Sequence, residues 1–394
     1  MQVGPLHDFA MASRAFPWKL VLIVSGLLVI GGLIGAYLVA MRGAVQAFYQ
    51  AEYQPEPLPN SLLGTPPPSA RVATVPWHSE KLGVVSSTCL RMLAAQQGVS
   101  IPRATADFLL GSTWGASPIP RRTGFFPGQD VEAGFLRAAP YLGLTRRYFT
   151  TDSGDDYVRA LKTLLSQGRA VRVALDRAML LEQRGLMPHA IILVGYDERG
   201  FEYYEPRCDD DTRCTPADRP AGHAGLQVPT SRLLLAVESL ALAVQYPWAY
   251  QALVLEPSAA PRPELSMLLA VNGRALIGQR TAGPSVGSVA VEDTAKALER
   301  HGNDVVTAEL KDGVGLAAVV RREDAEALRA LFPSRSELAK ASEALDEAAK
   351  YFAKAKEALE AKQLEQATAA LKDASRADLT AGRVLLDVAD AGAR

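Results

Sequence analysis

Residues 187–206 read MPHAIILVGYDERGFEYYEP, and this stretch carries the clearest fold signal in the chain. Its two apolar and aromatic runs, on either side of the turn sequence DERG, predict two antiparallel strands joined as a hairpin. His189 stands at the start of the first strand and Glu205 at the end of the second, so the pairing would bring an imidazole and a carboxylate together. A carboxylate on one ring nitrogen fixes the tautomer of a histidine and stabilises its protonated form, as a base that activates a nucleophile requires.

The segments around this hairpin alternate between helical and strand patterns. The predicted elements are a helix near residues 86–97, a strand near residues 144–150, a helix in residues 155–168 and a strand in residues 170–176. Together with the hairpin they predict one α+β domain over residues 77–258, which is long enough for a core of its own.

This order of elements resembles the papain-like domains of butirosin biosynthesis protein H and of the double-glycine leader peptidases attached to bacteriocin exporters. The resemblance covers roughly 180 of the 394 residues and lies in the motifs LRMLAAQQG, DDYVRALKTLLSQGRAVRVALD and HAIILVGYD and in the strand that ends in EP. It implies the α+β fold of papain-like cysteine peptidases, with a cysteine nucleophile, His189 as the base and Glu205 as its orienting partner. These relatives usually carry Asp or Asn at the last position, so Glu205 is a departure.

The nucleophile is a second departure from the family pattern. Laying the helix motif C-x-S-T-x-L-R-x-L on VSSTCLRML, residues 85–93, puts Val85 at the nucleophile position, and valine cannot attack a carbonyl. Cys89 lies one helical turn later, about 5–6 Å along the axis. The glutamine of the leader peptidases, about six residues before their nucleophile, has no counterpart in residues 71–90. The resemblance therefore implies a degenerate site that binds a peptide or protein partner without cutting it.

Two alternatives stay open. If Ser86 or Ser87 caps the helix, Cys89 lies in its first turn, where the helix dipole favours a thiolate. The chain would then be an active cysteine peptidase or acyltransferase using Cys89, His189 and Glu205. The other alternative is a structural subunit that assembles through its C-terminal helices.

The N-terminal region predicts a membrane anchor. Residues 20–41 contain no charged side chain and are long enough to cross a bilayer as a helix, and no A-x-A cleavage pattern follows them. Arg14 and Lys19 precede this span, so residues 1–19 are expected in the cytoplasm and the bulk of the chain outside it. The prolines concentrated between residues 52 and 76 predict a semi-rigid stalk over residues 42–76.

The C-terminal third predicts two further parts. Residues 259–333 carry no motif and predict a small α/β appendage. Residues 334–394 are rich in Ala, Glu, Lys and Leu and predict a helical hairpin with coiled-coil-like spacing. Its large apolar residues are seven apart: Leu338, Leu345, Phe352 and Leu359.

The remaining features concern partners and cofactors. Cys208 and Cys214 enclose the loop CDDDTRC and predict a disulfide outside the cytoplasm. The rival, a metal site on residues 209–211, is disfavoured because three adjacent aspartates cannot all face one ion. With 42 basic and 43 acidic residues the chain has no global field for nucleic acid, and neither a metal nor a cofactor is predicted.

Overall fold

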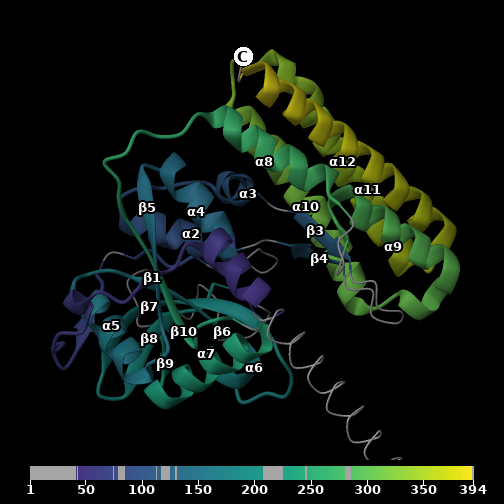
Figure 1. The fold of residues 1–394 in the computed structure, drawn as a ribbon. Helices are drawn as coiled ribbons and strands as arrows, with labels where there is room; N and C mark the ends of the chain where they lie inside the picture. The colour runs from purple at the N-terminus through teal and green to yellow at the C-terminus, as the bar shows by residue number, and fades with distance from the viewer. Residues whose placement is uncertain are drawn as a thin grey trace, which may run out of the picture. The chain divides into compact units, whose positions relative to one another are not determined.

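The structure is a computed structural model in which helices and a mixed sheet form an α+β protein (Figure 1). The residues described are 41, 43–73, 75–78, 85–111, 113–116, 125–128, 131–206, 225–244, 246–279 and 285–392. The chain divides into two units, residues 1–51 and residues 52–394. Residues 43–51 of the first unit are helical, and the elements below belong to the second.

The main sheet has, among the described residues, eight strands in the order β1-β5-β10-β6-β7-β8-β9, with β2 paired to β7. Their bounds are β1 Glu56–Pro57, β2 Ala70–Arg71, β5 Leu144–Thr151, β6 Val171–Asp176, β7 Pro188–Asp197, β8 Gly200–Tyr204, β9 Leu226–Val228 and β10 Tyr250–Pro257. The pairings are antiparallel except that of β1 with β5. Every residue of β6 and β8 is buried, so the sheet is covered on both faces there.

Helices α2, α5 and α7 pack on this sheet. The helices of this part are α2 Val85–Gln96, α3 Arg103–Leu110, α4 Val131–Tyr141, α5 Gly154–Ser166, α6 Arg177–Leu180 and α7 Thr230–Val244, with a 3-10 turn at Asn60–Leu62. A small second sheet holds β3 Thr113–Ala116, β4 Phe125–Gly128 and β11 Ser285–Val286.

The predicted elements of residues 77–258 are confirmed where the sequence pattern was strong. Helix α5 starts where Ser153 accepts a hydrogen bond from the Asp156 amide, and acidic residues in its first turn complement the helix dipole. The β7–β8 hairpin turns at the predicted sequence. Gly200 has a φ of +135° there, and a Cβ would lie 2.2 Å from the Val228 carbonyl oxygen of β9, so this position requires glycine.

The segment predicted as a stalk differs from that expectation, because residues from 53 to 72 contact the sheet at several points. Strands β1 and β2 pair with β5 and β7. The Tyr53 ring lies edge-on to Tyr148 with centroids 6.2 Å apart, and the carbonyl of Tyr53 accepts a hydrogen bond from Arg146 Nη2 over 2.5 Å. Leu62 and Val72 are buried. The prolines exclude this segment from the middle of a sheet but not from short terminal pairings, and the apolar residues between them supply the buried surface.

The C-terminal part is a layer of helices, green to yellow in Figure 1. It contains α8 Leu265–Ile277, α9 Gly287–His301, α10 Ala308–Leu331, α11 Ala339–Glu360 and α12 Leu364–Gly392, with 3-10 turns at Gly302–Val305 and Ser336–Leu338. Helix α11 packs between α10 and α12, and α8 and α9 pack on α12. One apolar core joins α9, α10, α11 and α12, and Val291, Val314, Phe352 and Leu371 are completely buried in it. We call α8–α12 the helical unit.

The predicted hairpin of residues 334–394 is present as α11 and α12, which meet at a turn where Lys362 has a φ of +59°. All four residues of the predicted apolar stripe are buried. The predicted α/β appendage differs from the structure: the described residues between 265 and 331 are mostly helical, and α9 and α10 share the core of the hairpin. The physical reason is that the alanine-rich faces of α11 and α12 admit neighbours on more than one side.

Two predictions fall on residues that are not described. The predicted transmembrane helix at residues 20–41 lies outside the described residues except for Met41, and so do Cys208 and Cys214 of the predicted disulfide. None of the helices in the described ranges is both long and apolar enough to span a bilayer.

Candidate functional site

The histidine and the carboxylate of the hairpin are in contact. Strand β7 begins at Pro188, and Glu205 directly follows the neighbouring strand β8, so antiparallel pairing places their ends together. The His189 Nε2–H donates to Glu205 Oε1 over 2.5 Å. Both side chains are buried, with exposed fractions of 4% and 5%. The predicted juxtaposition of imidazole and carboxylate is therefore present.

Two further residues hold Glu205 in place. Arg177 Nε lies 3.6 Å from Glu205 Oε2, and the Trp77 indole N–H donates to the main-chain carbonyl of Glu205 over 3.1 Å. Arg177 opens α6, directly after β6, and Asp176 caps this short helix by accepting from the Ala178 amide. Hydrogen bonds to the Asp176 carboxylate keep its pKa below the usual value, although its burial, the largest single influence, acts in the opposite direction. Sequence reasoning missed Arg177, and the only signal for it is a basic residue directly after a buried strand.

This arrangement has a definite chemical capacity. Glu205 occupies Nε2 of the ring, which leaves Nδ1 of His189 as the nitrogen that could accept a proton. Arg177 faces the other carboxylate oxygen, so the charge of Glu205 is partly compensated at a buried position. The group could orient a general base, and it could equally be a structural ion pair.

The start of α2 determines which of these roles is open. Val85, Ser86 and Ser87 are all helical, so both serines lie within α2 and neither is its N-cap. Cys89 therefore lies beyond the first turn, and its exposed fraction is 0%. The active-enzyme alternative requires a serine that caps the helix and a cysteine in its first turn. The observed helix has neither arrangement. Thr88 is also completely buried.

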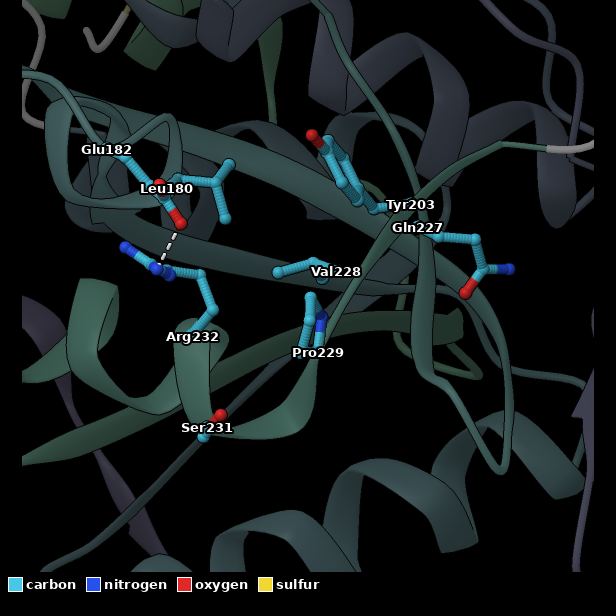
Figure 2. A pocket seen from close by; sticks show the side chains of 8 residues that line it. All are labelled: Leu180, Glu182, Tyr203, Gln227, Val228, Pro229, Ser231 and Arg232. Atoms are coloured by element: carbon cyan, nitrogen blue, oxygen red, sulfur yellow. Dashed lines mark hydrogen bonds and ion pairs between the residues drawn. The ribbon is translucent and has the colours of Figure 1, made fainter.

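A pocket of about 200 Å³ lies beside the same elements (Figure 2). Tyr203 precedes Glu205 by two residues on β8, and Leu180 ends the short helix that Arg177 opens. The pocket is lined by Leu180, Glu182, Tyr203, Gln227, Val228, Pro229, Ser231 and Arg232. Sequence reasoning could not find it, because its residues come from three separate segments, residues 180–182, 203 and 227–232, each without a motif.

The chemistry of this pocket is mixed. Leu180, Val228 and Pro229 supply apolar surface, and Glu182 and Arg232 form an ion pair, drawn as the dashed line in Figure 2. The side chains of this pair are 69% and 31% exposed, so the pair is worth at most about 1 kcal/mol. A ligand could exchange one partner of the pair at small cost.

In the part of the chain that the structure describes, no group of three or more His, Cys, Asp or Glu residues is placed to hold a metal ion. Residues 209–211 lie outside the described ranges. No protein-family model and no curated protein matches this sequence. The resemblance to papain-like domains therefore remains a proposal.

Proposed function

We propose that this chain is a membrane-anchored, extracytoplasmic protein whose papain-like domain binds a peptide or protein partner without cleaving it. The observation that carries the proposal is the complete burial of Cys89, which lies beyond the first turn of α2, with valine at position 85 in the same helix. A nucleophile must come within about 3–3.5 Å of the carbonyl that it attacks. A thiol without exposed surface reaches that distance only if the packed helix moves, and close-packed interiors resist such movement.

The pocket supplies a binding surface that needs no nucleophile. Its volume of about 200 Å³ suits one apolar side chain of a peptide rather than a large cofactor. It borders β9, which is the terminal strand of the main sheet among the described residues. An extended peptide that pairs with a terminal strand and places one side chain in an adjacent pocket is a recurrent mode of recognition.

The test uses the full chain in detergent with a library of ten-residue synthetic peptides, measured by fluorescence polarisation and mass spectrometry. We expect Ser231→Trp to weaken binding by tenfold or more, because the indole would fill the pocket from its exposed rim and exclude one apolar side chain, worth about 1.5–3 kcal/mol. Cys89→Ala should leave the affinity within about twofold. Leu235→Trp, one turn further on α7 and 51% exposed, is the matched control.

The same experiment tests the second candidate, a cysteine peptidase or acyltransferase. The 2.5 Å contact between His189 and Glu205 favours it, because an oriented base is half of such a site. Cleaved or acylated peptides that disappear with Cys89→Ala would overturn the binding proposal. If the Ser231→Trp and parent proteins bind every peptide with equal affinity, the pocket is not part of the peptide-binding site.

The membrane topology has its own test. We expect protease added to intact bacterial spheroplasts to digest residues 52–394, because the predicted anchor is preceded by Arg14 and Lys19 and would retain its N-terminus in the cytoplasm. Immunoblotting against the C-terminus measures the loss. Full protection, with digestion only after detergent lysis, would mean the opposite orientation.

A further inference from the structure

A buried chain of polar and charged side chains connects α2 to the helical unit. Ser87 of α2 hydrogen-bonds Asp107 of α3, whose side chain has an exposed fraction of 0%. Arg103, one turn earlier on α3, lies 3.6 Å from that carboxylate and 3.3 Å from the carboxylate of Glu323 on α10. The second of these contacts joins the helical unit to the main sheet and helices α2–α7, which we call the sheet-containing part. Ser87 stands two residues before Cys89.

This series of polar and charged side chains continues into the helical unit through Arg321, the largest of the fully buried side chains among the described residues. Its Nη1 donates to Asp324 over 2.8 Å, and its Nε and Nη2 donate to the two oxygens of Asp378 on α12 over 2.8 and 3.1 Å. Bidentate pairing of this kind orients an arginine strongly. Glu323 and Asp324 are adjacent on α10, so the two halves meet there. We call Ser87, Arg103, Asp107, Arg321, Glu323, Asp324 and Asp378 the charge cluster.

The charge cluster is not neutral when all its groups are ionised, because two arginines face four carboxylates. Burial, its largest influence, raises the pKa of Asp324 from 3.8 to about 6, although Arg321 acts in the opposite direction. Burial also raises the pKa of Asp378 and, to a greater degree, that of Asp107, where the charge of Glu323 adds to it. The folded cluster thus binds protons more tightly than solvated aspartates do.

We propose that the helical unit holds α2 in place through the charge cluster and releases it as the pH rises, so that the candidate site responds to the acidity of its compartment. The effect on ligands rests on the function proposed above, whereas the release of α2 does not. In the released state water reaches α2 and the carboxylates of the cluster, while the global fold persists.

The direction follows from the proton balance. In the closed state, in which the charge cluster holds α2, Asp324 keeps its proton up to about pH 6. In the released, solvated state it loses the proton near its usual pKa of 3.8. Closure is therefore favoured at low pH, and this contribution disappears as the pH rises through about 6. A single group with a pKa of about 6 in the closed state and 3.8 in the solvated state increases the equilibrium constant for release of α2 about tenfold between pH 5 and pH 8. Asp107 acts in the same direction.

The other elements packed on α10 bring few competing charges. Asp346 of α11 pairs with Arg329 at 2.9 Å, and these side chains are 35% and 50% exposed. Strand β4, which also packs on α10, has no ionisable residue. Asn272 of α8 donates to the Phe108 carbonyl of α3 over 3.0 Å, a contact that does not titrate. The charge cluster is thus the acid-sensitive contact between α3 and the helical unit among the described residues.

Cys89 is a natural reporter for release, since its thiol is completely buried in α2. The full chain in detergent is treated with N-ethylmaleimide at pH 5 and pH 8, and the Cys89 peptide is quantified by mass spectrometry. Dividing each rate by the rate in urea at the same pH removes the intrinsic pH dependence of the thiol. We expect Cys89 protection to fall about tenfold or more from pH 5 to pH 8.

Variants separate release from global unfolding. Asp324→Asn should make the protection of Cys89 almost independent of pH between 5 and 8, except for the part due to Asp107. Glu323→Gln, at a side chain that is 20% exposed, should reduce the protection of Cys89 already at pH 5. Arg329→Gln, in the exposed pair, should behave like the parent. Equal protection at both pH values in the parent would overturn the proposal, and so would protection that merely follows the global free energy of unfolding measured in urea.

Discussion

Replacing Arg321 with methionine is expected to lower the free energy of unfolding of the helical unit by about 3–5 kcal/mol at pH 8. Arg321 has no exposed surface, and it pairs with Asp324 and Asp378 at 2.8 Å. Methionine would fill most of the volume but leave two buried carboxylates without their cation. Urea unfolding followed by far-UV circular dichroism measures the loss.

The loss should be smaller at pH 5. Without Arg321 the pKa values of Asp324 and Asp378, already raised by burial, would rise further, because the attraction that opposes burial is removed. Groups with raised folded-state pKa values contribute stability that disappears as the pH increases, so the variant weakens from pH 5 to pH 8. The triple variant Arg321→Met, Asp324→Asn, Asp378→Leu should recover most of the loss.

The exposed pair of Arg329 and Asp346 provides the control on the same helix. Its side chains are half-exposed and 35% exposed, so Arg329→Met should change the free energy of unfolding by no more than about 1 kcal/mol. Equal losses in Arg321→Met and Arg329→Met would show that burial of the cluster adds nothing to its importance. A loss in Arg321→Met that does not depend on pH would contradict the raised pKa values of its partners.

The contrast between these two arginines shows where sequence reasoning stops. Both stand in the same helix, where a charged residue is typical of a solvated face, and the burial of Arg321 depends on the elements packed around α10, together with Asp378 of α12. The partners Arg321 and Asp378 are 57 residues apart, and no local pattern links them. The hairpin that joins His189 to Glu205 was predictable because the two strands are consecutive and the turn is short.

The two segments for which the sequence-based prediction differs from the structure were misassigned for the same reason. Periodicity reports which face of a segment is apolar but not which segment covers it, so residues 259–333 and the proline-rich residues 52–76 were separated from partners that they in fact contact. The candidate pocket has the same origin, since Tyr203 and Arg232 belong to different elements. Composition changes at residue 334 because the helices become alanine-rich, not because a new core begins.

Phe352→Ala is expected to destabilise α9, α10, α11 and α12 together by about 3–5 kcal/mol, because the ring is completely buried in the core that these helices share. Trp77 and Trp248 belong to the sheet-containing part, whereas Trp114 lies on β3, which packs on α9. With Trp18 and Trp114 replaced by phenylalanine, the remaining tryptophan fluorescence reports the sheet-containing part, whereas far-UV circular dichroism is dominated by the helices. At pH 8, where we expect the charge cluster to couple the parts least, the dichroism transition should move to lower urea and the fluorescence transition should stay.

Tyr351→Ala is the matched control for this prediction, since the neighbouring aromatic ring on the same helix is only partly buried. It should cost markedly less than Phe352→Ala, because less apolar surface and a smaller cavity are involved. If both transitions of Phe352→Ala move together, the sheet-containing part and the helical unit unfold as one cooperative body. The contacts of Arg103 with Glu323 and of Asn272 with the Phe108 carbonyl would then be strong enough at pH 8 to keep α3 on the helical unit, which contradicts release of α2 by deprotonation.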